Sequence, residues 1–181
     1  REKAQRMYKV ALVTGAARGI GREIALAFGE EGYHVAVNYL HSAGAAQETA
    51  QKIKKYGSQS ETIQADVTKA AQVSRMIEGV IDKWGRLDVL VNNAGQARDQ
   101  LLLKMSEKNW HEAIDANLTS AFLCLKAAAR AMIKNKDGSI INISSIVGLR
   151  GSIGCANYAA AKGGLLALTK SAAKELGRFN I

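Results

Sequence analysis

Three side chains in the last third of the sequence could carry acid–base chemistry. Tyr158 and Lys162 are four residues apart in a stretch of helical character, so both would leave the helix by the same face. Ser145 follows a short aliphatic run, residues 139–143, that predicts a buried strand, and open α/β sheets bind ligands at their strand ends. A neighbouring ammonium favours the phenolate and lowers the phenol pKa from about 10. Such a phenol could protonate a carbonyl oxygen or deprotonate an alcohol.

The same residues also allow a plainer interpretation. A tyrosine with a lysine four places later arises often by chance, and the pair could be a packing tyrosine and a solvated lysine. The elements that would have to position these side chains therefore decide between the two interpretations.

A glycine-rich turn follows the first predicted strand. Residues 8–14 form a short aliphatic run, and Gly15, Gly19 and Gly21 come directly after it, ahead of an amphipathic helix. Glycines let the backbone turn tightly and let a phosphate approach, while the helix N-terminus supplies free N–H donors. The spacing also suits a plain strand-to-helix turn, but the strand before it and the helix after it favour nucleotide binding.

The end of the second predicted strand, residues 33–39, indicates which dinucleotide would bind. Sheets that bind NAD carry an Asp or Glu there for the ribose 2′-hydroxyl, whereas this sequence has Asn38 and Tyr39. Arg18 in the glycine turn could reach the same place, although it could equally be a solvated loop residue. A cation present and a carboxylate absent favour NADP(H), which carries an extra phosphate.

The remaining chain alternates strands and helices. This order predicts an α/β fold, a doubly wound parallel sheet of the Rossmann type, in one domain over residues 1–181. Ser106 is a candidate N-cap for a short helix, with Asn109 three places on. The other predicted helices cover residues 43–56, 70–84, 113–135 and the segment from Tyr158 to 179, and the other predicted strands cover residues 60–64 and 87–91.

Several polar residues lie where a bound cofactor would pass. Asp66 ends the third strand and could contact an adenine amino group or cap the following helix. Asn93, Ala94 and Gly95 follow the fourth strand, where small residues admit a cofactor and an Asn can hold a neighbouring loop. Asn117 falls in the apolar part of a helix, so its amide must bond within the core or bend the helix and hold a water.

Composition excludes several other classes. The net charge is +9, but the cations are scattered rather than gathered in a stripe, so we expect no nucleic-acid partner. No apolar run approaches the roughly 20 residues of a membrane span, and the amino end shows no leader segment. The isolated Cys124 and Cys155 favour a reducing compartment, the cytoplasm or an organellar matrix. The three histidines show no metal-ligand spacing, and we expect no metal.

Taken together, these motifs resemble the short-chain dehydrogenase/reductase family, and most closely its 3-oxoacyl-[acyl-carrier-protein] reductases. The resemblance covers nearly the whole chain. It rests on Thr14, Gly15, Gly19, Ile20, Gly21, Asp66, the Asn92–Gly95 run, Asn117, Ser145, Tyr158 and Lys162, in the family's order and spacing.

The resemblance implies a role for each of these residues. Tyr158 would donate the proton, Ser145 would hold the substrate carbonyl, and Lys162 would lower the tyrosine pKa and bind the nicotinamide ribose. Asn117 would position a water that links Lys162 to solvent. The activity implied is NADPH-dependent reduction of a 3-oxoacyl group to a 3-hydroxyacyl group in fatty-acid biosynthesis. The cofactor-binding residues would be Gly15, Arg18, Gly19, Ile20, Gly21, Asn38, Asp66, Val67, Asn93, Ala94 and Gly95, with Tyr158 and Lys162.

The resemblance also predicts assembly and partners. We expect strand order 3-2-1-4-5, with two further family strands and a substrate lid missing after Ile181, which leaves an open sheet edge. Family members commonly form tetramers through their two longest helices. Lys134, Lys136 and Arg178 are candidates for docking an acidic acyl carrier protein. Two alternatives stay open: a relative acting on another small ketone or alcohol, and a non-catalytic NADP-binding subunit.

Overall fold

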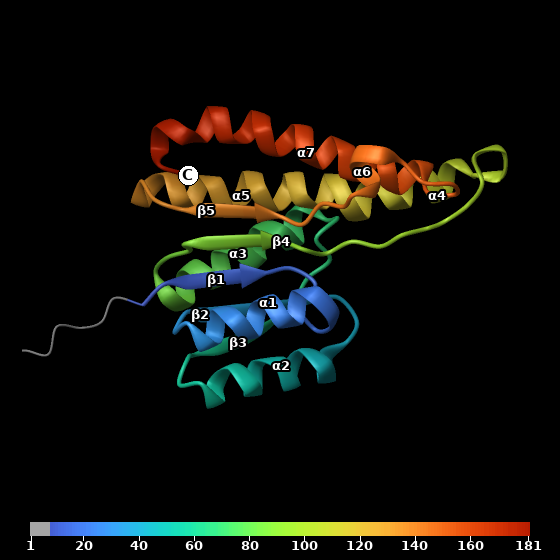
Figure 1. The fold of residues 1–181 in the computed structure, drawn as a ribbon. Coiled ribbons are helices and arrows are strands. Elements are labelled where there is room, and N and C mark those ends of the chain that lie inside the picture. The colour runs from blue at the N-terminus through green and yellow to red at the C-terminus, as the bar shows by residue number, and fades with distance from the viewer. Residues whose placement is uncertain (1–7) are drawn as a thin grey trace, which may run out of the picture.

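The computed structural model describes residues 8–181, and it contains a five-stranded parallel sheet with helices on both faces (Figure 1). The strand order is β3-β2-β1-β4-β5, and every neighbouring pair is parallel. The predicted fold class and strand order are therefore confirmed. The expectation about a leader segment concerns residues 1–7, which lie outside the described part.

The element bounds agree closely with the sequence pattern. The strands are β1 (Val10–Val13), β2 (His34–Tyr39), β3 (Ser60–Gln64), β4 (Val89–Asn92) and β5 (Ser139–Asn142). The helices are α1 (Gly19–Glu30), α2 (Ala43–Lys55), α3 (Ala70–Trp84), α4 (Glu107–Ile114), α5 (Ser120–Asn135), α6 (Val147–Arg150) and α7 (Ala156–Leu176). Short 3₁₀ turns cover Leu102–Lys104 and Gly177–Phe179.

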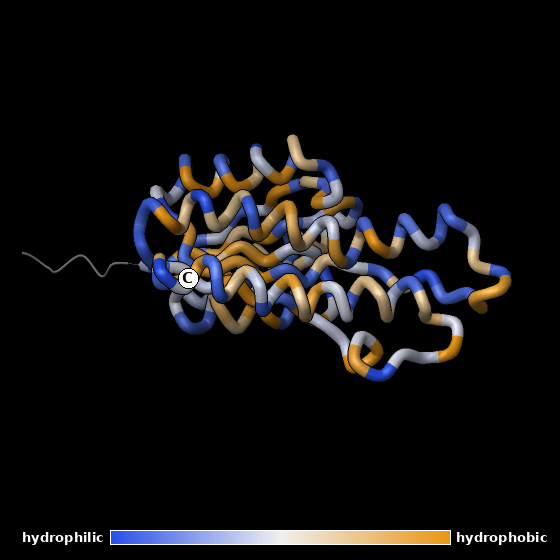
Figure 2. Tube along the Cα trace, turned by 90° about the horizontal axis from the view of Figure 1, so that it is seen from above, coloured by the Kyte–Doolittle hydropathy of each residue, from blue (hydrophilic) through white to orange (hydrophobic). Residues whose placement is uncertain are grey.

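The sheet separates two apolar cores. Helices α1 and α2 cover one face, packing Ala25, Ala50 and Ile53 against alternate residues of β1 and β2. Helices α3 and α5 cover the other face around Met76 and Met132, and α7 lies beside α5 over β5. The strands form an apolar band in the middle of the molecule (Figure 2). A strand buried on both faces explains the continuous aliphatic runs.

The helix predicted over residues 113–135 differs from the observed one. The helical path begins earlier, at Glu107, where Ser106 accepts a hydrogen bond from the Asn109 N–H at 3.2 Å, as the N-cap prediction expected. A π-helical segment, Asp115–Thr119, then separates α4 from α5. Such wide turns occur often at functional sites. The buried Asn117 lies within this one.

Strand β5 forms one edge of the sheet. It pairs with β4 on one side, and its Ile141 side chain is 40% exposed. The open edge agrees with the prediction. Within residues 8–181, no helix combines the length and the apolar character needed to cross a membrane.

The packing of α2 on the sheet predicts a large effect of one substitution. Ile53 is completely buried and lies against Gly29 of α1. We expect Ile53→Ala to lower the free energy of unfolding by about 2–5 kcal/mol, because the cavity cannot close fully. Chemical denaturation measures this loss. Leu103→Ala is the matched control, since Leu103 is 99% exposed, and it should change stability by less than about 0.5 kcal/mol. Equal effects of the two substitutions would contradict the described core.

Candidate active site

A hydrogen-bonded clasp joins the carboxyl ends of β1 and β4. The Thr14 hydroxyl accepts from the backbone N–H groups of Asn93 and Ala94, both at 3.0 Å, and donates to the Val91 carbonyl at 3.2 Å. The Asn93 side chain donates to the carbonyls of Thr14 at 2.9 Å and Gly15 at 3.3 Å. The Asn93 amide thus holds a neighbouring loop, as its position after a strand suggested. The clasp fixes the turn that starts at Gly15.

The glycine turn leaves space and donors for an anionic group. Gly15 and Gly19 have φ values of +62° and +58°, which disfavour other residues. A Cβ on Gly21 would collide with the Asn93 amide and lie 2.6 Å from the Gly15 carbonyl oxygen. Helix α1 begins directly after Arg18, without a capping side chain and without acidic residues in its first turn. Its free N–H groups fit a phosphate, so the turn suits the pyrophosphate of a dinucleotide.

Residues around the glycine turn divide into exposed and buried groups. Arg18 and Ile20 are exposed at its mouth. The Asn38 side chain, which was predicted to bind the cofactor, is 2% exposed and hydrogen-bonded within the protein. Its amide donates to the carbonyls of Ile63 at 3.2 Å and Ala65 at 3.1 Å, and its carbonyl accepts from the Gly15 N–H at 3.2 Å. Asn38 therefore shapes the turn, and its role in cofactor binding stays a prediction.

Asp66 and Val67 lie just beyond the end of β3. The Asp66 carboxylate accepts from the Thr68 N–H at 2.9 Å and the Thr68 hydroxyl at 2.7 Å, through the same oxygen Oδ1. It does not cap α3, whose first residue is preceded by Lys69 without a side-chain cap. Val67 is buried in the core. The second carboxylate oxygen of Asp66 stays free of hydrogen bonds to residues 8–181, which leaves it available to a ligand.

Lys162 is the most unusual charged residue of the site. Its side chain lies on α7, is 4% exposed, and donates from Nζ to the Ile143 carbonyl at 2.7 Å. Burial lowers the pKa of this ammonium, because the charged form loses hydration. The Nζ atom lies 5.7 Å from the centre of the Tyr158 ring, one helical turn earlier. Tyr158 and Lys162 therefore lie close together on α7, which agrees with their four-residue spacing.

Ser145 lies in the loop that follows β5 and is packed against the same helix. Its hydroxyl accepts from the Val147 N–H at 3.2 Å and keeps its own proton free to donate. The preceding Ser144 hydroxyl donates to the Lys162 carbonyl at 3.1 Å. A Cβ on Gly148 would lie 2.7 Å from the Lys162 carbonyl carbon. The loop after β5 therefore contacts the backbone of α7 at Lys162.

Asn117 reaches the site from the π-helical segment. Its amide donates to the carbonyls of Gln96 at 2.7 Å and Ala113 at 2.9 Å, while its Oδ1 is buried without a hydrogen bond among the described residues. A Cβ on Gly95 would collide with this Oδ1 and would lie 3.7 Å from Lys162 Nζ. The orphaned acceptor and the ammonium therefore flank Gly95, a polar pair that a water can bridge.

One positioning residue escaped the sequence analysis. Asn157 precedes Tyr158 and is completely buried, and its amide donates to the carbonyls of Arg98 at 3.0 Å and Asn109 at 3.1 Å. It fixes the start of α7 against the loop after β4. Its position beside Tyr158 was visible in the sequence, but its partners are about 50 residues away and no local pattern indicates them.

The three cations predicted to dock the acyl carrier protein lie away from the candidate active site. Lys134 and Lys136 end α5, and Arg178 follows α7, so all three occupy the edge of the sheet where strands begin. Arg178 is 20 residues after Tyr158, or roughly 30 Å along a helix. Asn117, Ser145, Tyr158 and Lys162 belong to segments at the opposite, carboxyl edge. Carrier docking on these three cations stays a prediction, and its distance from Tyr158 speaks against it within one protomer.

The fold and the glycine turn define a dinucleotide-binding α/β protein, and comparisons with known proteins narrow the class. The sequence model of the family described as short chain dehydrogenase matches residues 9–181. A 3-oxoacyl-[acyl-carrier-protein] reductase, FabG, of Staphylococcus aureus (strain Mu50) is 52% identical over 176 residues, which is 97% of this chain and 72% of the relative. A 3-oxoacyl-[acyl-carrier-protein] reductase of Synechocystis is 49% identical over 168 residues, 93% of this chain and 68% of the relative.

A solved structure agrees with these sequence relatives. A chain from Sinorhizobium meliloti 1021, assigned to the short-chain alcohol dehydrogenases, superposes with a TM-score of 0.91 at 35% identity, covering 94% of this chain and 68% of the other. The chain belongs to the short-chain dehydrogenase family, and it is an oxidoreductase that uses a nicotinamide cofactor.

The buried ammonium predicts how stability depends on pH. Because the folded-state pKa of Lys162 is lowered, its desolvation cost is complete at low pH and is relieved as pH rises between that pKa and the ordinary value of 10.5. We expect the Tm of the wild type to rise relative to that of Lys162→Met as pH increases from 7 to 10. Thermal unfolding at several pH values measures the difference.

Lys170→Met serves as the control, since Lys170 is exposed on the same helix. Its Tm difference from the wild type should stay constant over the same pH range. A constant difference for Lys162→Met as well would show that the ammonium is not desolvated in the folded protein.

Proposed function

We propose that this chain carries the NADPH-dependent reduction of 3-oxoacyl-[acyl-carrier-protein] to the 3-hydroxyacyl product. The observation that carries the proposal is the burial of Lys162 beside Tyr158, next to the loop that presents Ser145. The identity of about half of all residues to 3-oxoacyl-[acyl-carrier-protein] reductases supports the choice of substrate.

The residues of the site divide the work of the reaction. The Ser145 hydroxyl, whose proton is free, donates a hydrogen bond to the substrate carbonyl oxygen and holds it. The Tyr158 phenol gives its proton to that oxygen, so the carbonyl becomes an alcohol. Bound NADPH supplies the hydride that the carbonyl carbon receives. Lys162, fixed on the Ile143 carbonyl, keeps a positive charge beside the phenol.

The proton that Tyr158 loses has to be replaced after each turnover. Lys162 Nζ and Asn117 Oδ1 flank Gly95, and that glycine is exposed. A water between them would connect the buried ammonium to solvent. In this proposal the Asn117 Oδ1 atom accepts a hydrogen bond from that water and holds it in place, and Asn117 does not touch the substrate.

The preference for NADPH rests on charge at the end of β2. The end of β2 carries Asn38 and Tyr39 and no carboxylate, and the Asn38 side chain is neutral and buried. Arg18 is exposed on the glycine turn and free of ion pairs with other described residues. A guanidinium binds a phosphate strongly, whereas NADH offers only hydroxyls at that place.

A reductase of another small ketone is the second candidate, favoured by the 35% identical chain assigned to the alcohol dehydrogenases. The site residues would be the same in both. A homo-oligomer built through α5 and α7 is part of the proposal as well, because both helices are the longest of the fold.

Substitution of the phenol tests the reaction. With an acetoacetyl thioester and NADPH, we expect Tyr158→Phe to lower kcat at least about 10²-fold, since a general acid contributes about 10²–10⁴-fold. The affinity for NADPH, measured by fluorescence titration, should stay within about twofold. Near-normal turnover in Tyr158→Phe would remove the phenol from the mechanism. Faster wild-type turnover of free ketones or alcohols than of thioesters would favour the second candidate.

Substitution of the exposed guanidinium tests the cofactor. We expect Arg18→Ala to weaken NADPH binding about 10–100-fold, because a hydrogen bond to a charged group is worth about 1.5–3 kcal/mol. NADH binding should change less than about threefold. Lys52→Ala, an exposed cation on α2, controls for net charge and should leave both affinities unchanged. Equal losses for the two cofactors would reject the phosphate role.

A further inference from the structure

The end of β5 is joined to α7 by three consecutive side-chain hydrogen bonds. The Asn142 amide donates to the Thr169 hydroxyl at 2.9 Å, Lys162 Nζ donates to the Ile143 carbonyl at 2.7 Å, and the Ser144 hydroxyl donates to the Lys162 carbonyl at 3.1 Å. Asn142 and Thr169 have no part in the proposed chemistry. They nevertheless belong to the same strand end and helix face as Lys162.

The bond between Asn142 and Thr169 is the middle of a longer relay. The Asn92 side-chain amide at the end of β4 donates to the Asn142 side-chain oxygen Oδ1 at 2.8 Å, and the Thr169 hydroxyl donates to the Leu165 backbone carbonyl at 2.7 Å. The relay therefore runs from β4 through β5 into α7. Asn92 is 5% exposed and directly precedes Asn93, whose side chain holds the glycine turn. Polar bonds thus connect the cofactor side of the sheet with the helix that carries Tyr158.

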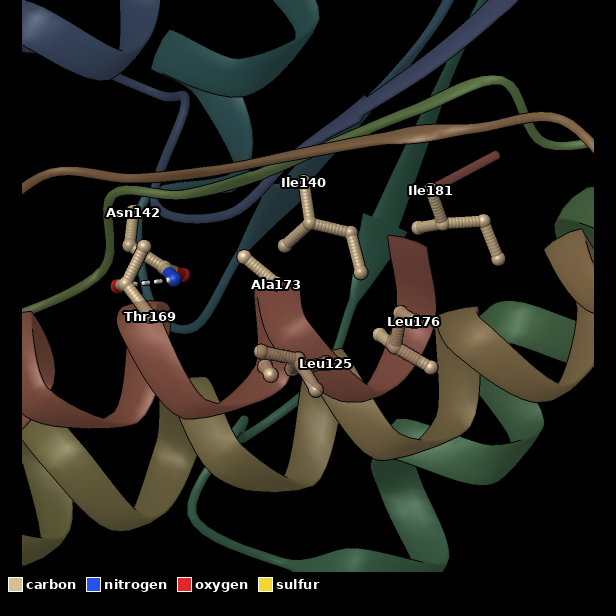
Figure 3. A pocket seen from close by; sticks show the side chains of 8 residues that line it. Leu125, Ile140, Asn142, Thr169, Ala173, Leu176 and Ile181 are labelled. Carbon is tan, nitrogen blue, oxygen red and sulfur yellow. Dashed lines mark hydrogen bonds between the residues drawn. The ribbon is translucent and has the colours of Figure 1, made fainter. Parts of the chain in front are cut away.

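The surroundings of this relay are apolar. Figure 3 shows Asn142 and Thr169 at one end of a small pocket between β5, α5 and α7. The rest of the pocket is lined by Leu125, Ile140, Ala172, Ala173, Leu176 and Ile181. Contacts among aliphatic side chains are not directional, so they alone do not set how far α7 lies along β5. Hydrogen bonds do set this position, because a hydrogen bond is lost when its donor and acceptor move apart by less than the spacing between two residues.

Helical spacing links the relay to the candidate site. Thr169 follows Lys162 by seven residues, which is two turns and about 10.5 Å along the same face of α7. Asn142 directly precedes Ile143, the acceptor of Lys162 Nζ. A shift or rotation of α7 that broke the bond at Thr169 would also move Lys162 away from Ile143. The Asn142–Thr169 and Lys162–Ile143 hydrogen bonds therefore fix α7 against the end of β5 at two points along the helix.

We infer that Asn142 and Thr169 are positioning residues, which set the height of α7 on β5 and so keep Tyr158 and Lys162 in register with Ser145. They act through the helix and touch neither substrate nor cofactor. The kinetic part of the following test rests on the proposed function, because it measures reduction of an acyl thioester.

The test uses Thr169→Val in the complete natural protein, because valine keeps the shape and removes the hydroxyl. We expect kcat for an acetoacetyl thioester to fall about tenfold, while the KM values for the thioester and NADPH stay within about twofold. Thr169→Ser keeps the hydroxyl and should retain more than half of the wild-type kcat. Wild-type kcat in Thr169→Val would overturn the inference.

Leu176→Ala is the matched control for general loosening of α7. Leu176 lines the same pocket with an aliphatic side chain that offers no hydrogen bond. This variant should lower the Tm at least as much as Thr169→Val, yet its kcat, measured well below the Tm, should stay within twofold of the wild type. An equal loss of kcat in both variants would reduce Thr169 to an ordinary stabilising residue and overturn the inference.

Hydrogen exchange separates this inference from the proposed function, since it needs no substrate. We expect amides of residues 143–148 to exchange faster in Thr169→Val but not in Leu176→Ala. If the wild type reduces no acyl thioester, the proposed function fails, and the exchange result alone decides the relay. Unchanged exchange at residues 143–148 in Thr169→Val would overturn it.

Discussion

The hydrogen bond from Lys162 Nζ to the Ile143 carbonyl is the contact on which the rest of the site depends. It places an ammonium where water barely reaches and ties α7 to the last residue before the Ser144–Ser145 loop. Because Tyr158 lies one turn earlier on α7, this contact contributes directly to its position relative to Ser145. The desolvation that lowers the Lys162 pKa destabilises the fold and is offset by packing elsewhere, which is common at functional sites.

The parallel sheet supplies the frame for that contact. All five strands end at one edge, so residues far apart in the sequence meet there: the glycine turn after β1, the Asn93 loop after β4 and Ser145 after β5. Thr14 and Asn93 lock the first two of these loops together. Asn117 enters from the side, because the π-helical turn aims its amide at the Gln96 carbonyl. Rigid strand ends and polar clasps thus hold the loops that do the chemistry.

Local patterns in the sequence predicted most elements and the placing of Tyr158 and Lys162 on one helix face, because aliphatic runs, glycine spacing and the i, i+4 rule are local signals. The strand order was expected from the family resemblance. Partners remote in sequence were not predictable in this way. Asn38 occupied the place of a ribose ligand, but β3 carbonyls lie within its reach and take its amide. The continuous α-helix expected from Ala113 contains a π-helical segment, Asp115–Thr119, where the Asn117 side chain donates to the Ala113 carbonyl one turn earlier and to the remote Gln96 carbonyl. The Asn142–Thr169 bond depends on how α7 lies along β5, which no single segment encodes.

The central claim is that one pocket gathers the Ser145 hydroxyl, the Tyr158 phenol and the Lys162 ammonium around a reacting carbonyl. A crystal structure of the complete protein with NADP⁺ and a 3-hydroxyacyl thioester tests it most directly. The account predicts the C3 oxygen of the thioester within hydrogen-bond distance of both Ser145 Oγ and the Tyr158 oxygen, with Lys162 still on the Ile143 carbonyl. A C3 oxygen bound away from these two hydroxyls, with the cofactor seated apart from the glycine turn, would contradict the account.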